Sequence, residues 1–138
     1  MIDFIVPGEP QGKARPRVER NRYTGAVHAR TPDKTVAYEE FIRWRCPKGE
    51  PLIGQIILQI DAVYGIPKST SKKQAEYMRK GLLFPMKKPD VDNIAKVVMD
   101  ALNGVVYPDD KNIVELYLRK RYIRDGEFPH VRIRIMEV

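Results

Sequence analysis

The chain has 138 residues, 43% hydrophobic and 31% charged, proportions that are typical of one folded domain and exclude a disordered chain. Its 25 Lys and Arg residues outnumber 18 Asp and Glu residues, and the resulting net charge of +7 favours a polyanionic partner such as nucleic acid. The single cysteine excludes an intramolecular disulfide, no Cys/His cluster supports a zinc site, and neither a signal peptide nor a membrane-spanning run is visible, so we expect a cytoplasmic protein.

The N-terminal third begins with a predicted strand at residues 2–6, which Pro7-Gly8 ends. Residues 8–30 are rich in Gly, Pro and Arg and lack apolar periodicity, so we predict a long, mobile, basic loop. Thr31 is then expected to cap a helix that has Pro32 in its first position and stops at Pro47. The predicted apolar stripe of this helix consists of Val36, Ala37, Phe41 and Trp44.

The remaining elements alternate between strands and helices. Residues 56–64 have the alternation of a strand, and Ser71 with Gln74 resembles a capping box at the start of a short helix that Gly81 closes. A second helix is predicted at 92–102, and two final strands at 113–123 and 130–137. The turn signal Asp125-Gly126 predicts that these two strands form a hairpin. Strands separated by helices indicate one α+β domain over residues 1–138, with a mixed sheet packed against two to three helices.

The helix predicted at 92–102 has two chemically different faces. Ile94, Val97, Val98, Ala101 and Leu102 share one arc and are expected to pack inward. Asp92, Lys96 and Asp100 are spaced i, i+4, i+8 and therefore stack along the opposite face. Asp90 precedes the helix, and either Asp92 or Asn93 is expected to cap it.

Two carboxylates two residues apart at a helix N-terminus suit a hard divalent cation. Magnesium takes one or two carboxylates and keeps water or phosphate oxygens as its other ligands. Such an ion can activate a water for attack on a phosphodiester, and Lys96 is placed to balance transition-state charge. The turn at Gly104 and residues 105–107 could return the chain, with Asp109-Asp110, toward the start of the helix.

Each acidic residue also has a purely structural interpretation. Asp90 and Asp92 could be helix caps, Asp109-Asp110 after Pro108 could be a turn, and Asp100 could pair with Lys96 or remain solvated. The convergence of these acids with Lys96, within about twenty residues of a basic chain, favours a metal-dependent site.

The same residues resemble the central motif of the RusA family of Holliday junction resolvases, which includes many prophage-encoded members. The matching segments are Lys88-Pro89-Asp90-Val91-Asp92-Asn93-Ile94-Ala95-Lys96, Asp100-Ala101-Leu102-Asn103-Gly104 and Val105-Val106-Tyr107-Pro108-Asp109-Asp110. Residues 7–17 and 66–74 are similar to two further family segments. The resemblance implies a RusA-like fold, magnesium-binding carboxylates at Asp90, Asp92 and Asp110, with manganese as a possible substitute, and a catalytic lysine at Lys96. Asp109 is the weaker candidate ligand.

The resemblance also implies a homodimer that resolves four-way DNA junctions by paired nicks in recombination and repair, without a small-molecule cofactor. Candidate DNA-binding residues are Lys13, Arg15, Arg17, Lys72, Lys73, Lys87 and Lys88. Tyr23 and Phe84 are candidates for stacking at a branch point, with ordinary packing as the alternative. Two other functions remain open: a branched-DNA or flap endonuclease without junction preference, and a non-catalytic nucleic-acid-binding protein.

Overall fold

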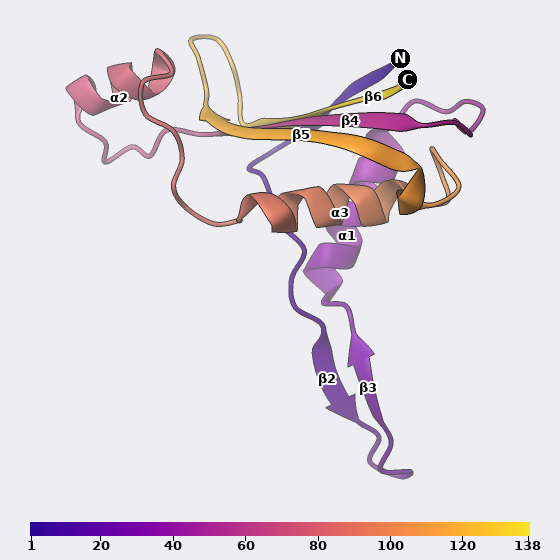
Figure 1. Cartoon of the computed structure of the whole chain (residues 1–138). Helices are drawn as coiled ribbons and strands as arrows, with labels where there is room; N and C mark the ends of the chain where they lie inside the picture. Colours follow the sequence, from indigo (N-terminus) through magenta and orange to yellow (C-terminus); the bar gives the residue numbers. More distant parts are fainter.

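The computed structural model describes all 138 residues and contains an α+β fold, as the sequence predicts (Figure 1). The elements in chain order are β1 (Ile2–Pro7), β2 (Arg17–Arg20), β3 (Val27–Arg30), α1 (Asp33–Arg45), β4 (Ile56–Tyr64), α2 (Lys72–Arg79), α3 (Val91–Leu102), a 3-10 turn (Asp110–Asn112), β5 (Ile113–Tyr122) and β6 (His130–Glu137).

The main sheet is mixed and has the strand order β1-β6-β4-β5. β4 runs parallel to β5 and antiparallel to β6, and β6 is also antiparallel to β1. The predicted hairpin between the last two strands is therefore wrong, because β4 lies between them. The Asp125-Gly126 turn is present, with Gly126 at a φ of +79°, but its connection crosses over β4 rather than joining neighbours.

One face of this sheet is covered by α1 and α3, and the core lies between the two layers (Figure 1). The inward residues of β6 are fully buried, as predicted: Val131, Ile133 and Ile135. The predicted inward face of α3 is fully buried as well: Ile94, Val97, Val98, Ala101 and Leu102. Because α3 buries this face, the face with Asp92 and Lys96 is turned away from the core.

Helix α1 departs from the prediction in its start and in its buried face. It begins at Asp33 after Pro32, and no side chain caps it, so Thr31 is not the cap. Its buried residues are Thr35, Tyr38 and Ile42, whereas Trp44 is 76% exposed. The true contact stripe includes a threonine and a tyrosine, which an apolar-residue count passes over.

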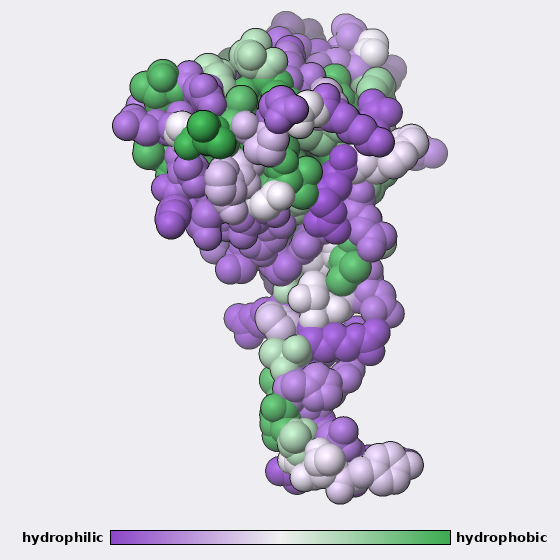
Figure 2. Space-filling model, turned by 90° about the vertical axis from the view of Figure 1, so that its right-hand side faces the viewer, coloured by the Kyte–Doolittle hydropathy of each residue, from purple (hydrophilic) through white to green (hydrophobic).

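Residues 8–30 are not one loop, because β2 and β3 pair within them as a separate antiparallel hairpin. This hairpin, residues 17–30, projects from the body of the molecule as an arm (Figures 1 and 2). None of its residues is buried, and Tyr23 at its tip is 94% exposed, so packing does not explain that side chain. We call residues 17–30 the arm below.

Helix α2 follows the predicted capping pattern. The Ser71 side chain accepts a hydrogen bond from the Gln74 backbone N–H at 3.3 Å, and Gly81 follows the helix with a φ of +77°. No helix in the structure has the length and apolar character that crossing a membrane requires.

Candidate active site

Asp90 is the N-cap residue of α3, but its side chain makes no capping hydrogen bond. The predicted cap at Asp92 or Asn93 is also wrong, since the helix begins at Val91. The Asp90 carboxylate is exposed and lies at the end of the helix where the macrodipole favours negative charge. The capping interpretation of Asp90 therefore fails, and its oxygens remain available to a ligand.

The outward face of α3 carries Asp92, Lys96 and Asp100 in consecutive turns, as the spacing predicts. Asp92 and Lys96 are exposed, whereas Asp100 is half-buried. Asp100 does not pair with Lys96: its Oδ2 lies 3.2 Å from the Lys13 ammonium, which also donates to Glu39 at 2.6 Å. The outward face is thus acidic at both ends with one free lysine between them.

Lys13 is bound by these two carboxylates and only 15% of its side chain is exposed. Burial disfavours the ammonium, but the hydrogen bonds and charges of Glu39 and Asp100 outweigh burial and raise the pKa of Lys13. The DNA contact predicted for Lys13 does not fit this position. The side chain instead ties the N-terminal segment to α1 and α3, and the sequence gives no signal for Glu39 as its partner.

The two residues of the acidic pair Asp109-Asp110 differ, because Asp109 has a structural hydrogen bond and Asp110 has one oxygen without a partner. The Asp109 side chain accepts a hydrogen bond from the Lys111 N–H at 2.9 Å and caps the 3-10 turn. Asp110 Oδ1 is buried and has no hydrogen-bond partner. Burial, followed by the negative charge of Asp100, raises the pKa of Asp110, although Tyr107 and Lys96 act in the opposite direction. A buried anionic oxygen without a partner is chemically suited to a cation.

After α3 the chain returns to the middle and C-terminal turns of the helix, and not to Asp90 and Asp92 at its start. The Tyr107 hydroxyl donates to the Met99 carbonyl at 3.1 Å, and Asp110 lies within electrostatic reach of Asp100 and Lys96. Asp92 and Asp100 are two helical turns apart, about 12 Å along the axis. No three His, Cys, Asp or Glu side chains form a group that could hold a metal ion. The carboxylate oxygens of Asp90, Asp92 and Asp110 are the kind of donor that a hard cation binds. In the free chain, however, they do not form one metal-binding group.

A basic groove of roughly 580 Å³ lies beside the start of α3. Its lining includes Arg15, Arg17 and Lys88, which were predicted to contact DNA, together with Lys34 and Pro89. The structure thus brings three separate sequence segments together, residues 10–17, 32–35 and 88–89, and the last of them directly precedes Asp90.

The N-terminal segment that forms this groove is docked closely on α3. The Lys13 N–H donates to the Asn93 carbonyl at 2.9 Å. A Cβ atom on Gly12 would lie 2.7 Å from the Pro89 Cβ and 3.0 Å from the Asn93 Cβ. Only glycine permits this approach without displacement of a neighbour.

The remaining predicted DNA-binding lysines lie outside the groove. The Lys87 ammonium is 5.4 Å from the centre of the Tyr64 ring and 5.9 Å from that of Tyr122, and Lys120 also lies over Tyr64. The Tyr64 hydroxyl donates to the Pro89 carbonyl at 3.3 Å. Lys120 also donates to the Lys87 carbonyl, so Tyr64 and Lys120 both support the segment before Asp90. No sequence signal points to them because they come from β4 and β5. Lys72 and Lys73 are exposed in the first turn of α2.

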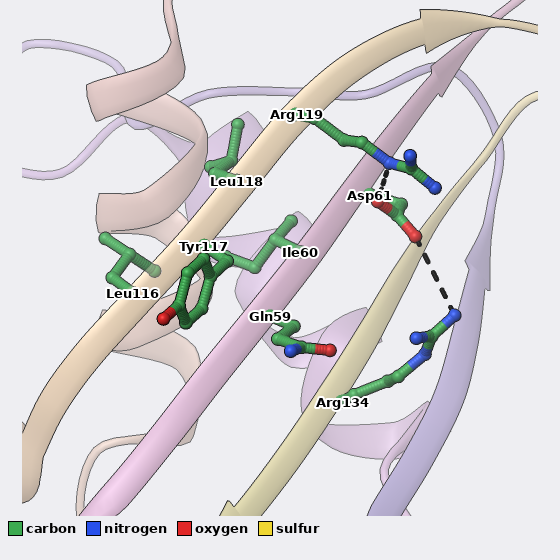
Figure 3. A pocket seen from close by; sticks show the side chains of 8 residues that line it. All are labelled: Gln59, Ile60, Asp61, Leu116, Tyr117, Leu118, Arg119 and Arg134. Atoms are coloured by element: carbon green, nitrogen blue, oxygen red, sulfur yellow. Dashed lines mark hydrogen bonds and ion pairs between the residues drawn. The ribbon is translucent and has the colours of Figure 1, made fainter.

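Another hollow, of roughly 490 Å³, lies on the sheet face opposite the helices and is lined by residues of β4, β5 and β6 (Figure 3). Its charges are paired: Asp61 accepts from Arg119 at 2.6 Å and lies 3.9 Å from Arg134. None of the predicted site residues lines it.

Comparison with known proteins places these observations in a family. The family model described as Endodeoxyribonuclease RusA matches residues 7–136. The chain is also 39% identical over 143 residues to "Uncharacterized protein YqaN" of Bacillus subtilis (strain 168), an alignment that covers 99% of this chain and 96% of that protein.

Proposed function

Because this chain belongs to the RusA endodeoxyribonuclease family, we propose that it is a magnesium-dependent Holliday junction resolvase that cuts four-way DNA by paired symmetric nicks as a homodimer. The observation that carries the proposal is that Asp90, whose carboxylate caps nothing, directly follows Lys88 and Pro89 in the lining of the basic groove. Guanidinium and ammonium groups beside an acidic residue can hold a phosphodiester next to it.

Asp90, Asp92 and Asp110 would hold the magnesium ion, which when bound supplies an activated water and stabilises the leaving 3′-oxygen. Lys96 lies one helical turn beyond Asp92 and is exposed, so its ammonium can offset the charge that develops on the phosphate. The unpartnered Oδ1 of Asp110 favours Asp110 over Asp109 as the third ligand. Because the three carboxylates are not grouped in the free chain, the proposal requires that metal and DNA draw them together.

The first experiment is cleavage of a synthetic mobile four-way junction, with magnesium and with EDTA. We expect paired symmetric nicks that require magnesium and that disappear in Asp92→Asn, while junction binding stays equal or becomes tighter because a negative charge near phosphate is removed. Asp125→Asn is the matched control, since this carboxylate is 98% exposed in the β5–β6 connection and should leave cleavage unchanged.

Metal binding supplies a readout that does not depend on cleavage. Calorimetric titration with magnesium or manganese should show binding to the wild type and to Asp109→Asn, and a loss of affinity in Asp90→Asn and Asp110→Asn. Equal affinity in all four proteins would remove these carboxylates from the metal site.

Two outcomes would favour the other functions. If the wild type binds junctions but never cuts them with either metal, the chain is a DNA-binding protein and its acids are structural. If linear duplex or flaps are cut as efficiently as junctions, the endonuclease assignment stands and the resolvase assignment falls.

A further inference from the structure

Strand β5 is a free edge of the main sheet, because it pairs with β4 on one side only. From Glu115 to Tyr122 its register is regular, and it contains neither proline nor glycine. Leu116 is 44% exposed and Tyr117 is 56% exposed. A long, regular and partly apolar edge presents unpaired backbone N–H and C=O groups to any other strand that can reach it.

The side chains of β5 are arranged symmetrically about Tyr117. Glu115 and Arg119 lie two residues before and after it. Both point to the open face of the sheet, where Glu115 accepts a hydrogen bond from the Tyr117 hydroxyl at 3.1 Å through one oxygen and Arg119 donates to Asp61. Leu116 and Leu118 lie one residue before and after it and point to the helix face, as the alternation of a strand requires (Figure 3). We propose that a second copy of this chain pairs with β5 antiparallel, about a two-fold axis at Tyr117, and joins the two sheets into one.

This register places opposite charges together. Each Glu115 lies directly opposite the Arg119 of the second copy, and each Leu116 lies opposite a Leu118. Arg119 is 65% exposed on its side chain, and only its Nε is engaged with Asp61, so its terminal N–H groups are free for Glu115. A two-fold axis at Glu115 would oppose two carboxylates, and one at Arg119 would oppose two guanidinium groups. An axis at Leu118 would oppose Glu115 and Arg121, but the Arg121 guanidinium is already bound by both carboxylate oxygens of Glu127. Of these axes, only the one at Tyr117 gives each Glu115 an accessible arginine.

The pairing has a consequence for the nuclease. A two-fold axis perpendicular to the joined sheet keeps the helix layers of both copies on the same side, so both α3 faces with Asp92 and Lys96 would face the same partner. A four-way junction has two-fold symmetry and needs two symmetric cuts. This inference rests on the homodimer in the proposed function and specifies its interface.

Charge reversal tests the register with sedimentation or light scattering at micromolar concentration. The wild type should be a dimer, and Glu115→Arg or Arg119→Glu should weaken it at least about tenfold, because each change creates two like-charge contacts per dimer. The double variant Glu115→Arg/Arg119→Glu, made together with Asp61→Asn because Arg119→Glu otherwise places a second carboxylate beside Asp61, should restore the dimer, since the opposite charges are exchanged. Failure of the double variant to recover, or a dimer in both single variants, overturns the proposal.

Cysteine cross-linking provides a second test that charge does not affect. In Tyr117→Cys the new cysteine would face its own copy with Cβ atoms about 5 Å apart, and mild oxidation should link the chains. Glu115→Cys is the control, because its two copies would be about 13 Å apart along the strands and should not link. The natural Cys46 is only 7% exposed and should stay unlinked.

The results separate this inference from the proposed function. If the wild type is a dimer that cleaves junctions but Tyr117→Cys gives no cross-link, the dimer has another interface, so the β5 inference falls and the resolvase stands. A cross-linked dimer that cleaves no DNA keeps the interface and removes the function. A monomeric wild type overturns the interface, whatever its activity.

Discussion

Asp110 carries a buried oxygen that the folded chain leaves without a partner, and burial with the nearby Asp100 raises its pKa. A carboxyl whose pKa is higher in the folded state destabilises the fold at neutral pH, and this penalty disappears as the pH falls through the raised pKa. Asp110→Asn should therefore increase the free energy of unfolding at pH 7 by up to about 1 kcal/mol, and the gain should shrink in acid. Denaturant titrations at pH 7 and pH 4 measure it.

The matched comparison for Asp110 is Asp109→Asn, because Asp109 has a defined structural hydrogen bond to the Lys111 N–H. An asparagine there keeps an oxygen acceptor, so we expect stability and cleavage close to those of the wild type. If Asp110→Asn lowers stability while cleavage survives, Asp110 has a structural role and the assignment of the free carboxylate is wrong.

Glu127 forms an ion pair with Arg121 whose contribution to stability depends on pH. Two hydrogen bonds from Arg121, at 2.7 and 2.8 Å, are the main cause that lowers the pKa of Glu127 to about 2, against a smaller opposing effect of burial. A lowered carboxylate pKa contributes stability that is present above its ordinary value of 4.5 and is lost as the pH falls toward 2. Glu127→Gln should cost about 2 kcal/mol at pH 7 and almost nothing near pH 2, as followed by chemical unfolding. An equal cost at both pH values would contradict the ion pair.

Among the elements, the contact between residues 10–15 and α3 depends on Gly12, where any Cβ would meet Pro89 and Asn93. Gly12→Ala should displace this segment, lower the free energy of unfolding by about 1–3 kcal/mol and reduce junction cleavage, because the groove with Arg15 and Lys88 loses its shape. Gly49→Ala is the control, since nothing lies within 4 Å of its added Cβ. Unchanged cleavage in Gly12→Ala would show that the groove does not position the substrate.

Some of the helices and strands could be predicted from the sequence, and others could not. Alternation and helical periodicity correctly predicted β4, β6 and α3, because each buries one continuous apolar face that dominates local preference. The pairing of β5 with β4 was not predictable from the Asp125-Gly126 turn. The turn connects β5 to β6, but a turn signal does not reveal that another strand, here β4, lies between the two strands that it connects. The arm was missed for a related reason: its strands pair only with each other and have no buried face.

The candidate site likewise combines local features that the sequence predicts with tertiary contacts that it does not. The spacing of Asp92, Lys96 and Asp100 fixes their common face, because helix geometry is local. Their partners are not local. Lys13 reaches Asp100 from a distant part of the chain and also binds Glu39 of α1, and Asp110 comes near Lys96 and Asp100 through the turn at Gly104. Ligand grouping is a property of the tertiary structure, and a motif alone does not supply it.

At the scale of the whole molecule, the arm is a projecting, arginine-rich hairpin that contributes no residue to the core. Its arginines are Arg17, Arg20, Arg22 and Arg30, and no residue of the arm is buried. An isolated two-stranded hairpin is marginally stable in water, which favours a role in which a partner holds it. The basic composition and the exposed Tyr23 at the tip match DNA, whose phosphates bind guanidinium groups and whose bases stack on aromatic rings.

Replacement of Arg20 and Arg22 by Gln should therefore leave thermal unfolding unchanged and weaken junction binding. Each lost phosphate contact should reduce the slope of log affinity against log salt by about 0.9, so the double variant should lose up to about 1.8. Fluorescence anisotropy over a range of salt concentrations measures the slope. Lys48→Gln, an exposed residue beyond the end of α1, is the control and should keep it. If the arm variant retains the wild-type slope but loses the dimer instead, the arm binds the second copy rather than DNA.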